Sequence, residues 1–347
     1  MRKHSSLFFA ILFFTSQFFA QEKLFTVEDV TLNAYSKFAV DNLKQLNWLP
    51  SSDSYVYVDK NSVILKFDTK KNKPDTLVKL EDINSQLEKL EIPKLNNFPI
   101  INWETASSFS FWANDFWLNY DLKNKQIKKI ANIENDGENK TVSPNSKYVA
   151  FTKANNLYVS LSTTQTVQIS HDTDTNIVNG QAVHRNEFGI NEGIFWSPNS
   201  NYIAYYRMDQ TMVTDYPLVD ISYTPARLKN IKYPMAGQAS HHVTIGIYNI
   251  KTGETIWLKT GEPLDQYFTC LTWSPDEKYF YVAHLNRDQN HLQLKKYNPA
   301  NGDVVKVLFE EKSDKYVEPQ NPLTFLSNSS NKFLWFSQRD GFNHLYL

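Results

Sequence analysis

The chain has 347 residues, and its 36 lysines and arginines nearly balance 37 aspartates and glutamates, for a net charge of −1. This balance argues against a nucleic-acid binder that relies on bulk positive charge, and 14% aromatic residues exclude a disordered chain. The single cysteine, Cys270, excludes an internal disulfide and a multi-cysteine metal site. The ten glycines form no G-x-S-x-G, G-x-G-x-x-G or Walker pattern, so no recognisable nucleophile elbow or phosphate loop is present.

Residues 1–20 have the pattern of a secretory signal peptide. Arg2 and Lys3 precede the apolar run Leu7–Phe14, which is too short to cross a bilayer, and the small residue Ala20 stands where the sequence turns polar. The alternative is a buried N-terminal strand. The pattern predicts an exported protein, periplasmic or secreted, and no later apolar stretch is long enough to predict a membrane span.

After the signal, two short helices and many short strands are expected. Thr26–Asp29 can cap a helix that begins before Val30, and residues 82–90 can form another turn or two. Elsewhere, runs of Tyr, Phe, Val and Ile alternate with other residues, and polar turn clusters separate them. These runs include Tyr55–Val58, Tyr148–Phe151, Asn156–Val159, Tyr202–Tyr205 and Tyr279–Val282.

A repeat links several of these runs. Ser143–Phe151, Ser197–Tyr205 and Ser274–Val282 match in register, each with Ser-Pro, polar residues, a tyrosine and then a strand pattern. Fainter copies begin at Trp48 and Leu326. A second unit predicts hairpins between outer strands at Tyr120–Lys125, Tyr248–Gly253 and Tyr297–Gly302. The repeat predicts an all-β chain of four-stranded propeller blades, with an insertion in the longer interval between Ser197 and Ser274; the alternative is an unrelated β-sandwich.

The order of several longer segments resembles one known family. In sequence they are Val183–Gly189, Phe195–Pro198, Ala204–Asp209, Tyr233–Gly237, Val243–Tyr248, Leu285–Asn290 and Arg339–Tyr346. From about Phe25 to Leu347 the chain is similar to the N-terminal β-propeller of the dipeptidyl peptidase IV group, within the prolyl oligopeptidase class of serine peptidases, in its Bacteroidetes form. The resemblance implies about six blades of an eight-bladed propeller, over residues 21–347, incomplete at the C-terminus.

The resemblance also implies a catalytic α/β-hydrolase domain, whose Ser, Asp and His follow in that chain order. No such domain is recognisable here, and the sequence ends at Tyr346–Leu347 within a strand pattern. We therefore expect a partial propeller truncated before the catalytic domain, with no catalytic residue, cofactor or metal of its own. The expected partners are the missing hydrolase domain, the N-terminus of a peptide substrate and a second copy in a homodimer.

The resemblance finally implies a substrate-binding segment, in which adjacent glutamates bind the free N-terminal ammonium of a peptide. The family pattern there is an aromatic residue followed by three acids, and the matching run is His184, Arg185, Asn186 and Glu187. The candidate substrate-binding residues are thus Glu187, Asn186 and Arg185, of which only Glu187 keeps the carboxylate. This departure leaves dipeptidyl, tripeptidyl and looser aminopeptidase specificity open. Glu187 could instead be an ordinary solvated acid, and Glu192 is a second candidate for its role.

Other patterns favour structural roles. His241 and His242 are adjacent, so on a strand they would point to opposite faces and would not share one metal; a surface or hairpin role is expected for them. His184 is expected to be packed within a blade. Residues 172–176 alternate oxygen-bearing side chains but lack the glycine and distal glutamate of an EF-hand, which predicts a polar loop. Cys270, within a strand pattern, is expected to be a buried and inert thiol.

These observations favour the propeller portion of an exported serine exopeptidase. In the full-length protein it would gate the active site and bind the substrate N-terminus, and alone it would hydrolyse nothing. The alternative is a stand-alone periplasmic propeller that acts as a binding module, or a non-catalytic remnant. An open reading frame downstream that encodes the hydrolase pattern would favour the first.

Overall fold

The computed structural model describes residues 24–40, 42–71, 73–327 and 329–347. The predicted signal peptide, residues 1–20, lies outside the described residues. The chain divides into two compact units, Met1–Lys44 and Gln45–Leu347. In the first, α1 (Val27–Thr31) begins at the predicted capping box, where Thr26 and Asp29 each accept the other's backbone N–H at 3.1 Å.

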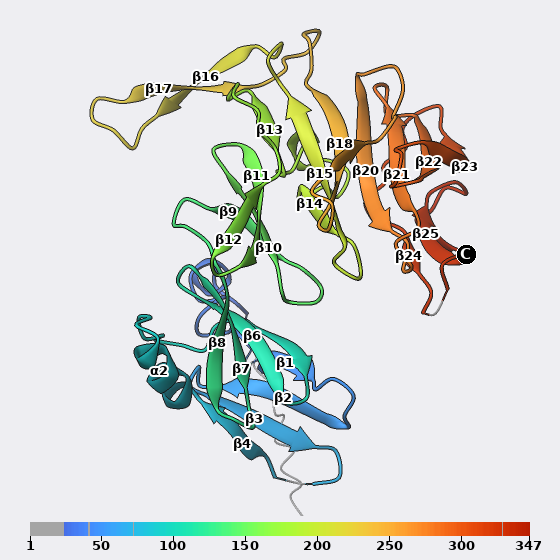
Figure 1. Ribbon diagram of the computed structural model, residues 1–347. Coiled ribbons are helices and arrows are strands. Elements are labelled where there is room, and N and C mark those ends of the chain that lie inside the picture. The colour runs from blue at the N-terminus through green and yellow to red at the C-terminus, as the bar shows by residue number, and fades with distance from the viewer. Residues whose placement is uncertain (1–23, 41, 72, 328) are drawn as a thin grey trace, which may run out of the picture. The chain divides into compact units, whose positions relative to one another are not determined.

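The second unit consists mainly of antiparallel sheets that follow one another along the chain (Figure 1). The first three have four strands each. The first is formed by β1 (Lys44–Trp48), β2 (Ser54–Asp59), β3 (Val63–Asp68) and β4 (Asp75–Lys79), and the second by β5 (Ile101–Thr105), β6 (Ser108–Ala113), β7 (Phe116–Asp121) and β8 (Gln126–Asn132). The third is formed by β9 (Glu138–Val142), β10 (Val149–Lys153), β11 (Asn156–Ser162) and β12 (Gln165–Gln168). Within each, neighbours in space are neighbours in sequence.

The later sheets repeat this arrangement with one insertion. The fourth is formed by β13 (Ile177–Asn179), β14 (Ile194–Trp196), β15 (Tyr202–Asp209), β18 (His242–Asn249) and β19 (Thr255–Trp257). The fifth is formed by β20 (Gln266–Trp273), β21 (Phe280–Asn286), β22 (His291–Tyr297) and β23 (Val304–Lys312), and the sixth by β24 (Thr324–Phe325), β25 (Phe333–Ser337) and β26 (His344–Tyr346). Successive sheets of this kind are the blades of a β-propeller, and the described residues form six of them, as predicted.

The insertion predicted between the second and third repeats is a two-stranded sheet. Its strands, β16 (Asp215–Asp220) and β17 (Arg227–Lys232), lie between β15 and β18 in sequence and pair only with each other. We call this hairpin the arm (Figure 1). It accounts for the longer spacing between Ser197 and Ser274.

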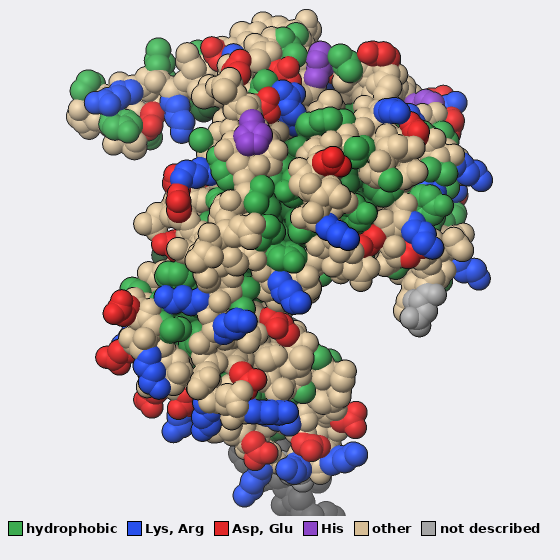
Figure 2. Space-filling model, in the orientation of Figure 1, with side chains coloured by type: hydrophobic (Ala, Val, Ile, Leu, Met, Phe, Trp, Pro, Cys, Tyr) green, Lys and Arg blue, Asp and Glu red, His purple; other side chains and the backbone are tan. Residues whose placement is uncertain are grey.

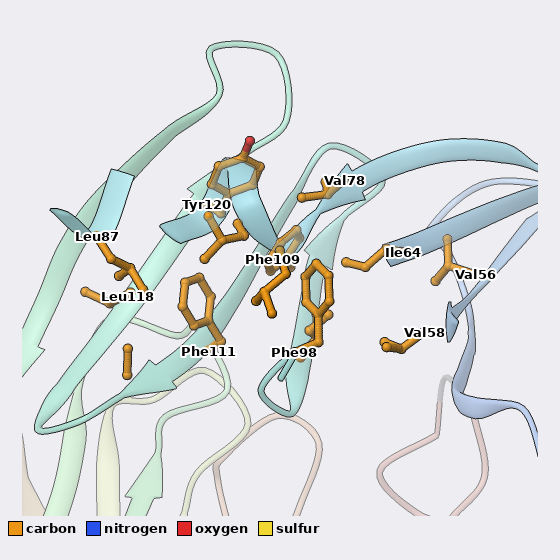
Figure 3. Close-up of a cluster of buried hydrophobic side chains, with 14 of the residues drawn as sticks. Val56, Val58, Ile64, Val78, Leu87, Phe98, Phe109, Phe111, Leu118 and Tyr120 are labelled. Carbon is orange, nitrogen blue, oxygen red and sulfur yellow. The ribbon is translucent and has the colours of Figure 1, made fainter. Parts of the chain in front are cut away.

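The first blade buries alternate residues of its second strand, as a pleated sheet with one covered face does, whereas the central strands β10, β15 and β21 of later blades are buried on both faces. In β2, Val56 and Val58 are buried, whereas Tyr55 and Tyr57 between them are half-buried. The second predicted helix is α2 (Leu80–Lys89), whose buried Leu80, Ile83 and Leu87 join the core of the first two blades. Figure 3 shows this cluster, in which Phe109, Phe111 and Leu118 of the second blade meet Ile64 and Val78 of the first.

The surface mixes charges of both signs. On the face drawn in Figure 2, lysines and arginines are interspersed with aspartates and glutamates, and no large area carries one sign. This pattern agrees with the net charge of −1.

The repeated Ser-Pro turns share one hydrogen-bond pattern. The hydroxyl oxygens of Ser143, Ser197 and Ser274 accept the backbone N–H of the tyrosine five residues later, at 2.9, 2.9 and 3.0 Å. All three serines are buried. The backbone N–H of each serine also donates to the carbonyl of that tyrosine, at 2.9–3.0 Å. The turn therefore sets the register with which the innermost strand meets the next strand.

These turns also connect neighbouring blades. The Ser200 hydroxyl accepts the Asn145 N–H at 3.1 Å, and one Glu277 carboxylate oxygen accepts the Asn199 N–H at 2.6 Å. The other Glu277 oxygen accepts the Asn201 amide at 2.6 Å. Each turn thus donates to a side chain at the same position of the next turn. We call these contacts the inter-blade clasp.

Aromatic stacking reinforces the clasp. Tyr148 stacks on Trp196 of the next blade, and Tyr202 stacks on Trp273, with ring centroids 6.3 and 5.6 Å apart. The Trp196 indole N–H donates to the Thr141 hydroxyl at 3.0 Å, and that of Trp273 donates to the Phe195 carbonyl at 3.1 Å. Each tryptophan therefore contacts the preceding blade through both its face and its N–H.

The buried Glu277 is the most sensitive point of the clasp. Glu277→Ala leaves the Asn199 N–H and the Asn201 amide without their acceptor, and we expect it to lower the free energy of unfolding by about 2 kcal/mol. Urea denaturation measures this loss. Glu254→Ala, at an exposed acid in the β18–β19 turn, is the matched control and should change the value by less than about 0.5 kcal/mol. Equal effects of the two substitutions would contradict the role given to Glu277.

Candidate functional site

The predicted substrate-binding residues lie on one strained turn. Residues 183–190 connect β13 to β14 and contain the short 3₁₀ segment η1 (His184–Asn186). The φ angles of His184, Arg185 and Asn186 are 52°, 57° and 62°, all in the left-handed region. Consecutive left-handed residues other than glycine are costly, so the surroundings must hold this conformation in place.

His184 is the main internal anchor of the turn. Its side chain is 4% exposed, and its Nε2 accepts the Phe268 backbone N–H at 3.3 Å. Because Nε2 accepts, the proton of the neutral ring lies on Nδ1, which donates to Nε2 of His241 at 3.0 Å. His184 is buried, as predicted, and it packs against β20 of the next blade. A buried histidine pair thus joins the turn to β20 and to the start of β18.

The expected surface or hairpin role of His241 was wrong. His241 is 8% exposed and lies against His184, with ring centroids 5.0 Å apart. His241 lies just before β18, which begins at His242, where the chain passes against the turn. Its partner is 57 residues away in sequence, so no local pattern indicates the contact.

Four further contacts hold the turn. The Thr269 hydroxyl donates to the Phe188 carbonyl at 2.7 Å. The rings of His184 and Phe188 both meet Tyr267 edge-on, at 5.0 and 5.1 Å. Gly189 has a φ of 72°, and a Cβ there would lie 2.1 Å from the Gln320 carbonyl oxygen. Only glycine therefore allows the turn to approach the segment between β23 and β24 this closely.

Arg185, Asn186 and Glu187 are all exposed on this anchored turn. The Arg185 guanidinium donates to the Lys232 carbonyl at the end of the arm and lies over the Tyr233 ring, 4.9 Å from its centroid. Among the described residues, the Glu187 carboxylate and the Asn186 amide have no hydrogen-bond or ion-pair partner. The structure thus brings the three candidates together and leaves the carboxylate and the amide free to meet a ligand.

Glu192 lies elsewhere. It lines a cavity of about 420 Å³ together with residues of β9, β14 and β20, and none of residues 184–189 contributes to that lining. Apolar neighbours, including Trp196, Leu271 and Trp273, surround this cavity, and burial raises the pKa of the Glu192 carboxyl. A second cavity of about 470 Å³ lies beside β23 and β25, where Glu311 already pairs with Arg339 at 2.9 Å.

The sequence analysis missed residues that support the turn from a distance. Tyr267 touches both His184 and Phe188, and its hydroxyl accepts from Gln289 at 3.3 Å and from Arg287. Arg287 and Gln289 belong to the segment Leu285–Asn290, which carried part of the family resemblance but was given no role. Their position in the β21–β22 hairpin was the one signal that could have indicated a role for these residues. The turn that they support lies about a hundred residues earlier, so the sequence did not indicate the contact itself.

The other singled-out groups are structural. In residues 172–176, Asp172 pairs with Arg207 at 2.6 Å, which lowers the pKa of Asp172, and Asp174 accepts from Asn176. Cys270 is buried, and burial raises its pKa to about 12, which confirms the predicted buried thiol. Over the described ranges, no group of three or more His, Cys, Asp or Glu side chains could hold a metal ion. In the same part of the chain, no helix is long and apolar enough to cross a membrane.

Comparison with known proteins decides the family. Residues 101–347 match the family model described as the dipeptidyl peptidase IV (DPP IV) N-terminal region. The chain belongs to this family. The match includes the site turn and the second to sixth blades.

Solved structures agree with this DPP IV N-terminal assignment. The chain is similar to the crystal structure of a protein named "putative dipeptidyl aminopeptidase IV" from Bacteroides ovatus, with 40% identity, a TM-score of 0.80, and coverage of 88% of this chain and 42% of that one. It is also similar in fold to dipeptidyl peptidase 4 from Porphyromonas gingivalis, with 20% identity, a TM-score of 0.71, and coverage of 94% and 48%.

Curated relatives cover the same region. A "Probable dipeptidyl-aminopeptidase B" from Talaromyces stipitatus is 26% identical over 278 residues, which are 71% of this chain and 30% of that protein. A protein of the same name from Phaeosphaeria nodorum is 26% identical over 320 residues, covering 76% and 34%. The chain therefore spans about a third of the length of these relatives.

The histidine pair predicts how this DPP IV N-terminal region responds to acid. Burial foremost, and then Arg185 and Arg287, lower the pKa of His241 to about 4, and burial also lowers the pKa of His184 well below its usual value. In the unfolded chain both titrate near ~6.5. Between these values the unfolded chain binds more protons, so the free energy of unfolding should fall as pH falls from about 6.5 to about 4.

Urea denaturation at pH 7 and pH 5 measures this fall. His241→Asn should reduce it, whereas His171→Asn, at an exposed histidine, should not. The NMR signal of His241 should stay constant between these two pH values. A His241 signal that titrates with a midpoint near ~6.5 would show that the pair is not buried as described.

Proposed function

We propose that this chain is the propeller portion of an exported serine exopeptidase, which gates the active site and binds the N-terminus of the peptide substrate. Glu187 is the observation that carries this proposal. Its carboxylate is exposed and unpartnered within the described residues, on a turn that His184, Phe188 and Gly189 hold rigidly. This turn lies within the part of the chain that matches the DPP IV N-terminal region.

The chemistry of the turn suits an ammonium group. The Glu187 carboxylate can accept charge-assisted hydrogen bonds from a free N-terminus, and the Asn186 carbonyl oxygen can add a neutral acceptor. A rigid turn loses little conformational entropy when the ligand binds. One carboxylate holds an ammonium less strongly than two. We therefore propose an aminopeptidase with dipeptidyl, tripeptidyl or less strict specificity for the length of the released peptide.

Peptide hydrolysis would take place on a hydrolase domain joined to the propeller. There a serine would attack the peptide carbonyl, a histidine would take the serine proton, and an aspartate would orient that histidine. The propeller would hold the substrate's amino end, which fixes the distance from the N-terminus to the cleaved bond. We also propose that the protein is exported, on the pattern of residues 1–20.

We further propose that the arm makes the subunit contact of a homodimer. A two-stranded sheet is marginally stable alone, and this one exposes Val219 by 65% and Leu228 by 73%. Its strands carry opposite charges, with Asp215 and Asp220 on β16 and three basic residues on β17. A second arm packed in antiparallel orientation would set β16 of each copy against β17 of the other.

Peptide binding tests the role of Glu187. The purified chain should bind Ala-Pro-Ala-amide more tightly than its N-acetylated form, because acetylation removes the ammonium. Glu187→Gln should abolish this preference, whereas Glu254→Gln should keep it. Isothermal titration calorimetry gives both affinities. Equal affinity for the free and acetylated peptides in the unmodified chain would reject the proposal, as would release of p-nitroaniline from Ala-Pro-p-nitroanilide by this chain alone.

Analytical ultracentrifugation tests the arm. Leu228→Lys places a charge on the exposed apolar face of β17, and we expect it to shift the protein from dimer toward monomer. Lys251→Glu, an exposed charge change in the β18–β19 turn, is the control and should leave the sedimentation coefficient unchanged. An unmodified chain that sediments as a monomer at micromolar concentration would remove the basis for this contact.

A further inference from the structure

We infer that Arg185 is a specificity-determining residue that binds the side-chain carboxylate of an acidic N-terminal residue, so that preferred peptides begin with Asp or Glu. The inference rests on the proposed function of Glu187, which would bind the α-ammonium of the same residue. Three observations support it: the fixed position of the guanidinium, its lack of a carboxylate partner, and its distance along the chain from Glu187.

The guanidinium of Arg185 is held in place before any ligand binds. It donates to the Lys232 carbonyl and stacks over Tyr233, at 4.9 Å. The stacked face and the single bond leave other N–H donors of the planar group directed away from Lys232. A pre-ordered guanidinium presents the paired donors that match the two oxygens of a carboxylate.

The positive charge of this guanidinium also has no ion-pair partner within the described residues. Three other arginines form ion pairs: Arg207 with Asp172 at 2.6 Å, Arg339 with Glu311 at 2.9 Å, and Arg287 with Asp265 at 3.7 Å. Within the described residues, no carboxylate lies within 4.0 Å of Arg185, although Glu187 is only two residues away. The turn thus holds a positive and a negative group apart instead of pairing them.

Arg185 and Glu187 present opposite charges from one exposed turn, two residues apart in sequence. The α-ammonium and the side-chain carboxylate of Asp or Glu carry the two complementary charges within a single residue. An N-terminal acidic residue therefore offers a cation to Glu187 and an anion to Arg185.

The charge balance of the turn favours such a ligand. An ammonium alone would be attracted by Glu187 and repelled by Arg185, because the second charge has the same sign. A neighbouring carboxylate on the ligand turns that repulsion into attraction. His184 and His241 are buried next to the turn and neutral near pH 7, so they do not compensate the guanidinium.

Four peptide amides test this inference on the full chain: Asp-Ala-Ala and Asn-Ala-Ala, each with a free or an acetylated N-terminus. With a free N-terminus, we expect Asp to bind about five-fold more tightly than Asn, as an exposed ion pair gives. Arg185→Gln should remove this difference and Arg185→Lys should retain part of it. Lys251→Gln is the control, because Lys251 is an exposed cation in the β18–β19 turn and lies outside the proposed peptide and subunit contacts.

The outcomes separate the two proposals. Equal affinities for the Asp and Asn peptides, with the free N-terminus still preferred over the acetylated one, would overturn the role of Arg185 and leave that of Glu187 intact. No effect of acetylation would overturn the role of Glu187. Urea denaturation verifies that Arg185→Gln still folds with one cooperative transition, and a loss of Asp preference in a variant that keeps this transition would support the inference.

Discussion

The buried serine of the Ser-Pro turn is the element on which the rest of the structure depends. Its hydroxyl accepts the backbone N–H of the tyrosine five residues later, which fixes the register of two strands in each of three blades. The same turns then donate to Ser200 and Glu277 of the next blade. Since one local motif orders both the strands within a blade and the contact between blades, three copies are enough to build a repetitive architecture.

The packing between blades holds the candidate site in a backbone conformation that the local sequence disfavours. Three consecutive left-handed residues on the turn before β14 are stable only because His184 is buried against His241 and the β20 backbone. Neighbouring blades supply these contacts, so the position of Glu187 depends on the packing between blades. Strain of this kind is typical of functional sites, where a side chain must be exposed and still rigid.

The site also shows how a family's recognition surface can change while its fold is kept. The family resemblance implies three acids where this chain has Arg185, Asn186 and Glu187. The Lys232 carbonyl at the end of the arm and the ring of Tyr233, the residue that follows it, anchor the new guanidinium. A change of charge at one position is thus supported by a contact from an insertion that is far away in sequence.

The sequence by itself determined the elements whose hydrogen bonds are local. The capping box of α1, the Ser-Pro turns and the Tyr-to-Gly hairpins each close within about ten residues, so the residue order predicts them, and their repetition predicts the blades. Only the tertiary structure decided which side chains support Glu187. His241, Phe268 and Lys232 reach the turn from 47 to 84 residues away, through strands whose packing no local pattern encodes. For the same reason, the sequence named Arg185 as a departure from the family, and the fold showed that its charge is anchored and unpaired.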